Sequence, residues 1–227
     1  FSSHFERIKL SLSILKMKND YTLEFFNEKV LQLLKLNKVS HGSIKIHISR
    51  GGAGRYLPET VYTDLLITSV SGEVYKNNKP ISLCFYDMQY KSIGSLSNIK
   101  SANSLVSVLA LVHAKENNFD NAILLNSSGN IAEVANANLF IVKNKKIYTP
   151  PLLEGCVDGT MRKWVFNQVV VFEKVILKHD VLSADEVFIT NAINGFTPID
   201  NVEEKYYKSF KIATFFQQNL INSCSDF

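Results

Sequence analysis

The sequence has few cysteines, no long apolar run and no cluster of basic residues. Its three cysteines, Cys84, Cys156 and Cys224, are odd in number, widely spaced and outside any CxxC or cysteine–histidine pattern. This distribution argues against a disulfide scaffold and against a metal site, and it is typical of proteins kept in a reducing compartment. We therefore expect a cytoplasmic protein without a bound metal.

Two classes of partner are disfavoured by what is missing. No apolar run is long enough to span a bilayer and no signal-peptide pattern is present, so we expect no association with a membrane. The net charge is only +4 and the basic residues form no stripe, so no nucleic-acid partner is expected. The first residue is Phe1 rather than methionine, and helix-like sequence follows at once, which predicts that an N-terminal segment is missing.

The chain is nevertheless rich in apolar residues that recur with clear periodicity. Of its 227 residues 46% are hydrophobic, enough for the core of one large or two small domains. In its first part, helices are predicted over residues 4–17 and 22–36, and strands over residues 42–50, 61–70 and 81–87. These elements together predict a small N-terminal α/β domain over residues 1–88.

A larger C-terminal domain is predicted over residues 89–227. The first of its helices, over residues 100–117, carries Leu105, Val108, Leu109 and Val112 on one face. Further helices are predicted over 159–170 and 208–221, and strands over 122–126, 131–134, 139–142, 147–150, 173–178 and 185–192. Because helices and strands interleave along the whole chain, the expected fold class is α/β or α+β.

Two kinds of ionisable residue stand out in the second domain. The stretch KSIGSLSNIKSANSL carries Lys91 and Lys100, and most lysines are solvent-exposed, so chemistry at either needs support from the rest of the chain. Glu133 lies among apolar neighbours at the end of a predicted hairpin strand, where an unpaired carboxylate is costly. It is expected either to cap a turn or form a salt bridge, or to hold a protonated nitrogen of a ligand.

Several turns could line a ligand site, although each also has an ordinary structural interpretation. In YTPPLLEGCVDGTMRKW a glycine precedes a helix that begins near Thr160, a combination that can cradle a phosphate. The loop TNAING, residues 190–195, leaves a strand through small and polar residues. The glycine-rich loop RGGAGRY carries Arg50 and Arg55, and guanidinium groups commonly clamp carboxylates. A lysine, a half-buried glutamate, a helix start and arginines are together the components of a pyridoxal-phosphate site.

The order of these motifs resembles that of the fold-type IV pyridoxal-phosphate enzymes, the class IV aminotransferases. Lys100 is followed by ILLNSSGNIAEVANANLFIV, IYTPPLLEGCVDGTMR and ADEVFITNAINGFTPI, and the match covers roughly residues 4–200 in collinear order. The resemblance implies a two-domain fold, with pyridoxal 5'-phosphate between a small N-terminal and a larger C-terminal domain. It also implies a homodimer and an amino acid-like substrate.

The resemblance also implies a role for each matching residue. Lys100 would form the Schiff base and move protons, and Glu133 would hold the protonated pyridine nitrogen of the cofactor. The remaining implied cofactor-binding residues face the phosphate and are Arg7, Gly159, Thr160, Met161, Asn191 and Ala192. Arg55 and Asn103 would contact the substrate.

The motifs favour one subfamily without excluding the other. The run KSAN, the loop TNAI and RGGAGRY resemble 4-amino-4-deoxychorismate lyase, which releases pyruvate and p-aminobenzoate. The alternatives are an aminotransferase for branched-chain or D-amino acids, and a non-catalytic ligand-binding protein on the same fold. The sequence leaves the amino donor and acceptor open.

Spacing separates the two lysines. Lys100 lies 33 residues before Glu133, as in the family, whereas Lys91 lies nine residues further away. We therefore expect Lys100 to begin the helix and to be the catalytic lysine. Lys91 is expected to be an exposed lysine in the linker between the two domains.

Overall fold

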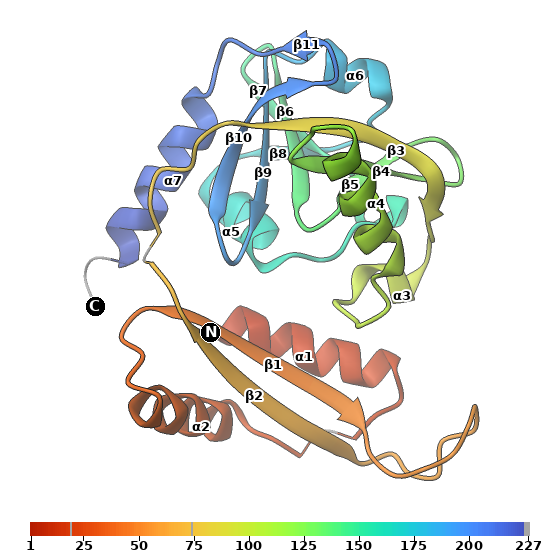
Figure 1. Cartoon of the computed structure of the whole chain (residues 1–227), viewed down its shortest axis with the longest axis vertical. Coiled ribbons are helices and arrows are strands. Elements are labelled where there is room, and N and C mark those ends of the chain that lie inside the picture. Colours follow the sequence, from red (N-terminus) through yellow and green to blue (C-terminus); the bar gives the residue numbers. More distant parts are fainter. Residues whose placement is uncertain (19, 74, 225–227) are drawn as a thin grey trace. The chain divides into compact units, whose positions relative to one another are not determined.

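The computed structural model of the chain describes residues 1–18, 20–73 and 75–224. The chain divides into two compact units, Phe1–Val74 and Tyr75–Phe227 (Figure 1). This division lies before the boundary expected after residue 88. The reason is strand β3, Ile81–Lys91, which is hydrogen-bonded between strands of the second unit and therefore belongs to it.

The first unit is a two-stranded antiparallel sheet with two helices. Its elements are α1 (Ser2–Ile14), α2 (Leu23–Leu36), β1 (Gly42–Arg50) and β2 (Thr63–Ser71). Gly42 pairs with Ser71 at one end of the sheet and Arg50 pairs with Thr63 at the other. Helix α2 begins where the Thr22 hydroxyl accepts the N–H of Phe25 at 3.1 Å. The predicted helices and the alternation along residues 42–50 are confirmed.

The second unit is built on one large mixed sheet. In the described part of the chain its strand order is β5-β4-β3-β10-β9-β6-β7-β8, with β11 beside β10. Its other strands are β4 (Asn121–Asn126), β5 (Ile131–Val134), β6 (Asn138–Lys143), β7 (Lys146–Thr149), β8 (Val171–Glu173), β9 (Glu186–Asn191), β10 (Gly195–Val202) and β11 (Lys205–Tyr206). Strand β3 runs parallel to both β4 and β10 at the centre of this order.

Helices and aromatic residues cover the large sheet. Its helices are α3 (Ser95–Asn98), α4 (Leu105–Glu116), the 3-10 turn η1 (Leu152–Glu154), α5 (Thr160–Gln168), α6 (Lys178–Leu182) and α7 (Lys211–Cys224). Figure 1 shows α4 beside β3 and β4, and α7 beside β10, and these elements are in contact. Stacked rings of Phe140 and Phe188, with centroids 5.0 Å apart, lie in the core under α5 and α7.

A buried carboxylate secures the start of the C-terminal helix. Glu186 on β9 is 2% exposed. It accepts the hydroxyl of Ser209 at 2.9 Å, and the N–H groups of Ile212 and Ala213 at 2.9 Å and 2.8 Å. These donors precede or begin α7, so Glu186 neutralises the positive end of the helix dipole and satisfies N–H groups that lack intrahelical acceptors.

One predicted strand of the second unit is wrong. A strand is predicted over residues 173–178, but β8 ends at Glu173 and a helix begins at Lys178. The carboxylate of Asp180 accepts the N–H of Leu177 at 2.9 Å, which closes the first turn of α6. A short apolar run such as residues 175–177 is compatible both with a strand and with the segment that leads into a helix, so the sequence alone does not distinguish them.

The helix expected over residues 100–117 begins later, and its buried face differs from the expected one. Helix α4 starts at Leu105, so Lys100 lies in the irregular segment between α3 and α4. Ala110 and Ala114 face the sheet, whereas the apolar residues at helical spacing are exposed, namely Leu105, Val108, Leu109 and Val112. Apolar residues occur on several sides of this helix, so periodicity alone could not select the side that packs.

Candidate active site

Glu133 is a buried carboxylate with a partner for each oxygen. It lies on β5, opposite Leu124 of β4, and is 4% exposed. Its Oε2 accepts the backbone N–H of Val157 at 2.8 Å, and its Oε1 lies 2.5 Å from the Nζ of Lys91. A carboxylate can accept about four hydrogen bonds, so acceptor sites remain for a ligand. Both expectations for Glu133, a salt bridge and a ligand-holding acid, are compatible with this geometry.

Opposing effects act on the charge of Glu133. Burial raises the pKa of Glu133 above its usual value, and the charge of Lys91 is the largest effect that lowers it again. The N–H of Val157 and the charge of Lys100 also lower this pKa. Lys100 is therefore close enough to Glu133 for their charges to interact.

Lys91 is not the exposed linker lysine that the sequence predicts. It is the last residue of β3, and its side chain is only 16% exposed. The expected strand ends at residue 87, but β3 continues and resumes pairing with β4 where Lys91 lies opposite Asn126. This extension carries the lysine to the carboxylate. A lysine at the end of a central parallel strand was the available signal, because such ends commonly line sites in α/β proteins.

Lys100 lies in the segment between α3 and α4 and is exposed. The residues before it are firmly held. Ile99 is 5% exposed, and the Asn98 amide donates to the carbonyls of Leu152 and Cys156 at 2.8 Å and 2.7 Å. The segment after it is more open: the N–H of Asn103 donates to the hydroxyl of Ser101 at 3.3 Å, in an exposed turn.

The start of helix α5 lies next to the loop that contacts Glu133. Gly159 is the N-cap of α5, and Thr160 and Met161 in its first turn are 9% and 8% exposed. The Asn138 amide donates to the carbonyl of Val157 at 2.9 Å, and a Cβ on Gly159 would collide with the Oδ1 of Asn138. A larger residue here would therefore have to displace the Asn138 side chain, and the positive end of the α5 dipole lies at this turn.

The loop that follows β9 is linked to the turn that follows Glu133. The Asn191 Oδ1 accepts the N–H groups of Ile193 and Asn194 at 3.0 Å and 2.9 Å, and its amide donates to the carbonyl of Asn136 at 3.4 Å. The hydroxyl of Tyr75 donates to the carbonyl of Ala192 at 2.7 Å. The structure therefore connects Asn191 to the turn after Glu133, and Ala192 follows it in the same loop.

The remaining expected residues belong to the first unit. Arg7 lies on α1, half-buried, and burial together with the charge of Arg7 lowers the pKa of His4 to about 4. Arg55 is exposed in the loop after β1. Their roles toward a cofactor or substrate stay predictions. Arg50, in contrast, donates to the carbonyls of Leu15, Lys16 and Thr60, which is a structural role.

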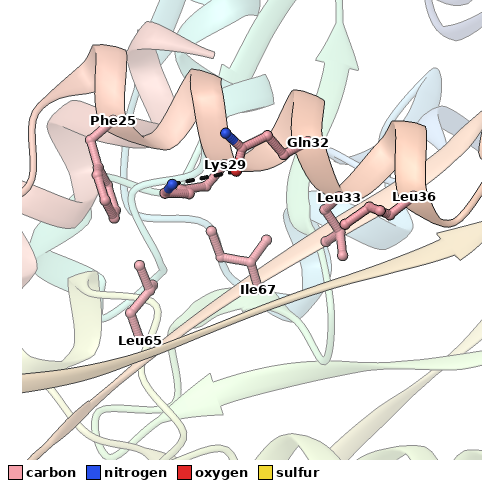
Figure 2. Close-up of a pocket in the computed structure, with 7 residues that line it drawn as sticks. All are labelled: Phe25, Lys29, Gln32, Leu33, Leu36, Leu65 and Ile67. Carbon is pink, nitrogen blue, oxygen red and sulfur yellow. Dashed lines mark hydrogen bonds between the residues drawn. The ribbon is translucent and has the colours of Figure 1, made fainter.

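A shallow apolar groove of about 320 Å³ lies between α2 and β2 of the first unit. Figure 2 shows Lys29 at this groove, with its Nζ donating to Gln32 at 3.3 Å, and the full lining is Phe25, Lys29, Gln32, Leu33, Leu36, Leu65 and Ile67. None of the expected site residues lines it. Within the described ranges no group of three or more potential metal ligands occurs, and no helix could span a membrane.

With this geometry in place, comparison with known proteins identifies the family. Residues 1–202 match the family model of amino-transferase class IV. The chain belongs to this family. The assignment confirms the resemblance found in the sequence, the expected fold and the expectation that the protein is an enzyme of class IV.

The relatives of this class IV chain carry several activities in their names. The aminodeoxychorismate lyase of Vibrio harveyi is 30% identical over 181 residues, which are 73% of this chain and 65% of the lyase. The D-alanine aminotransferase of Staphylococcus epidermidis RP62A is 28% identical over 222 residues, 95% of this chain and 78% of that protein. The chain spans less than two thirds of the V. harveyi lyase and 42% of a Methanocaldococcus jannaschii relative.

Solved structures agree with the fold. The branched-chain amino acid aminotransferase of Thermobaculum terrenum in its PLP form superposes with a TM-score of 0.85 at 21% identity, over 96% of this chain and 76% of that one. The branched-chain aminotransferase of Escherichia coli gives a TM-score of 0.84 at 22% identity, over 95% and 75% of the two chains.

The second unit contains side chains suited to pyridoxal phosphate. A buried carboxylate suits a protonated ring nitrogen, a nearby lysine has the amine that condenses with an aldehyde, and the N–H groups at a helix start after a tightly packed glycine suit a phosphate. Sequence reasoning did not find the residues that support this arrangement: Lys91, Asn98, Asn138 and Val157.

Proposed function

We propose that this class IV enzyme uses pyridoxal 5'-phosphate to act on an amino acid-like substrate. The observation that carries the proposal is Glu133, a buried carboxylate held by a lysine and a backbone N–H, with a second lysine within range of its charge. Lys91 and the N–H of Val157 offset the cost of burying this acid, and its remaining acceptor sites suit the N–H of a protonated ring nitrogen.

In this proposal each residue has one task. Pyridoxal phosphate, when bound through a lysine, withdraws electrons from the substrate carbon next to the amine. Glu133 would keep the proton on the ring nitrogen, and the Lys100 amine would remove the proton from the substrate Cα. The start of α5 from Gly159 to Met161 and the Asn191–Ala192 loop would hold the phosphate, and the role that the resemblance implies for Arg7 stays a prediction.

We favour 4-amino-4-deoxychorismate lyase as the specific activity. Its support is the set of motifs KSAN, TNAI and RGGAGRY, together with the V. harveyi lyase as a relative at 30% identity. Under this assignment Asn103 would bind the substrate, whose enolpyruvyl group leaves as pyruvate, and the role that the resemblance implies for Arg55 stays a prediction. The second candidate is an aminotransferase, favoured by the S. epidermidis relative that aligns over 95% of this chain. A purely ligand-binding protein is the third, and the retention of both Lys100 and Glu133 argues against it.

We further propose that the protein acts in the cytoplasm as a homodimer. The support for dimerisation is the outer face of α4, where Leu105 is 66% exposed and three further apolar residues follow at helical spacing. An uncovered apolar stripe of this kind is typical of a protein interface. The charged variant Leu109→Lys should yield a monomer in sedimentation, whereas Lys115→Glu on the same helix should not. An unchanged sedimentation coefficient for both would contradict a dimer through α4.

The experiment that tests the function begins with the covalent lysine. Protein incubated with pyridoxal phosphate should turn yellow, and borohydride reduction followed by peptide mass mapping should place the adduct on Lys100. Lys100→Ala should carry no adduct and show no turnover, whereas Lys115→Ala, a matched exposed lysine, should behave as the natural chain does. A colourless natural protein without adduct would contradict the proposal.

The same preparation then separates the activities. Incubation with 4-amino-4-deoxychorismate should release pyruvate and p-aminobenzoate if the lyase assignment is correct. Incubation with D-alanine or with branched-chain amino acids and 2-oxoglutarate should produce glutamate if the aminotransferase assignment is correct. Glutamate without p-aminobenzoate would overturn the lyase assignment and leave the cofactor assignment intact.

A further inference from the structure

The ion pair between Lys91 and Glu133 has features that an incidental salt bridge lacks. Its Nζ and Oε1 are 2.5 Å apart, and the two side chains are 16% and 5% exposed. Salt bridges with an exposed partner usually have little consequence for stability. Here the ammonium of Lys91 and the carboxylate of Glu133 are both removed from water, which is favourable only when the geometry of the pair is good and the remaining hydrogen-bond acceptors are satisfied.

The surroundings of Glu133 make Lys91 its main counter-charge. The second carboxylate oxygen accepts the N–H of Val157, which is a dipole and not a full charge. Lys100 contributes a smaller effect from the α3–α4 segment. Cys156 in the adjacent loop supplies no charge, because burial raises the pKa of its thiol to about 12. Burial already holds the pKa of Glu133 above its usual value with Lys91 in place, so removing the charge of Lys91 would raise this pKa further and favour the protonated acid.

We propose that Lys91 is a positioning residue of the active site: it favours the ionised form of Glu133 and fixes its Oε1, so that the carboxylate can accept the N–H of a protonated ring nitrogen. The cofactor part of this inference rests on the proposed function, whereas the control of Glu133 by Lys91 does not.

The first test measures the ionisation of Glu133 in cofactor-free protein. Infrared difference spectra between each protein and its Glu133→Gln counterpart report the carboxyl group of Glu133 as the pH changes. Lys91→Met keeps the length of the side chain but removes the charge, and should raise the pH of protonation by about one unit or more. Lys91→Arg keeps the charge and should stay close to the natural protein. An unchanged midpoint in Lys91→Met would overturn the inference.

The second test covers the possibility that Lys91→Met is too unstable to titrate. A double-mutant cycle of Lys91→Met and Glu133→Gln, followed by urea unfolding of the cofactor-free protein, measures the coupling within the pair. Removing Lys91 should destabilise far less when Glu133 is already neutral. Additive effects would overturn the inference.

The third test uses pyridoxal phosphate itself. Lys91→Met should bind it at least about tenfold more weakly, and the pH dependence of its visible absorption should shift in parallel with the protonation of Glu133. If the natural protein binds no pyridoxal phosphate, the proposed function fails, while the two cofactor-free tests still decide the role of Lys91. If Lys91→Met binds as tightly as the natural protein, with the same absorption profile, the positioning role fails and the proposed function stands.

Discussion

Replacing Gly159 by alanine tests whether the helix start and the Glu133 site form one unit. A Cβ at this position would collide with the Oδ1 of Asn138, which lies on β6, and would lie 3.6 Å from the Cβ of Arg162. The Asn138 amide donates to the carbonyl of Val157, whose N–H binds Glu133. Moving Asn138 should therefore disturb the carboxylate through this loop.

The magnitude follows from the contacts that must change. Gly159 has φ −70° and ψ 140°, so alanine meets no backbone strain and the cost comes from packing. Inserting a methyl group into a tightly packed site costs about 1–3 kcal/mol. Loss of the Asn138–Val157 hydrogen bond adds about 0.5–1.5 kcal/mol. We expect Gly159→Ala to lower the free energy of unfolding by about 1.5–4.5 kcal/mol in total.

The assay compares urea unfolding and pyridoxal phosphate affinity of the same variant. Gly159→Ala should lose both stability and affinity, because the methyl group disturbs the turn proposed to bind phosphate. Gly72→Ala is the matched control, since its Cβ would meet only the Cα of Gly42, at an ordinary 3.5 Å. Natural stability and affinity in Gly159→Ala would refute the packing and the proposed phosphate site together. Lost stability with natural affinity would refute only the link to phosphate.

Two further predictions concern groups outside the proposed site. Glu186→Ala removes the acceptor for three donors at the start of α7, so buried N–H groups lose their partner. Urea unfolding should show a free energy of unfolding lower by about 2–3 kcal/mol. Glu204→Ala, at an exposed position, is the control and should change little; equal effects would contradict the capping role. Burial raises the pKa of the Cys84 thiol to about 11 and that of the Cys156 thiol to about 12, whereas Cys224 is exposed. Iodoacetamide at a mildly alkaline pH of about 8 should therefore modify Cys224 alone in the native protein, and all three thiols after unfolding. Rapid modification of either buried thiol in native protein would contradict their burial.

Local patterns predicted most elements of the fold. The alternation of Ile44, Ile46 and Ile48 requires one buried face, and the strand forms where the pattern predicts it. The hairpins around Glu133 form as expected because turn-forming residues separate short apolar runs. Where residues are apolar on several sides, as in α4, the pattern could not select the face that packs, and the stripe at helical spacing is exposed.

Motif order and spacing are properties of the chain, so they were enough to identify the family and the fold class, whereas the roles of Lys100 and Glu133 stay predictions. The surroundings of Glu133, in contrast, depend on how distant segments pack. Its partners come from the end of β3 and from the loop before α5, and no local pattern specifies that two such segments meet. Lys91 illustrates the difference: as a residue in a polar stretch it is an ordinary lysine, and as the end of an extended central strand it becomes the counter-charge of a buried acid.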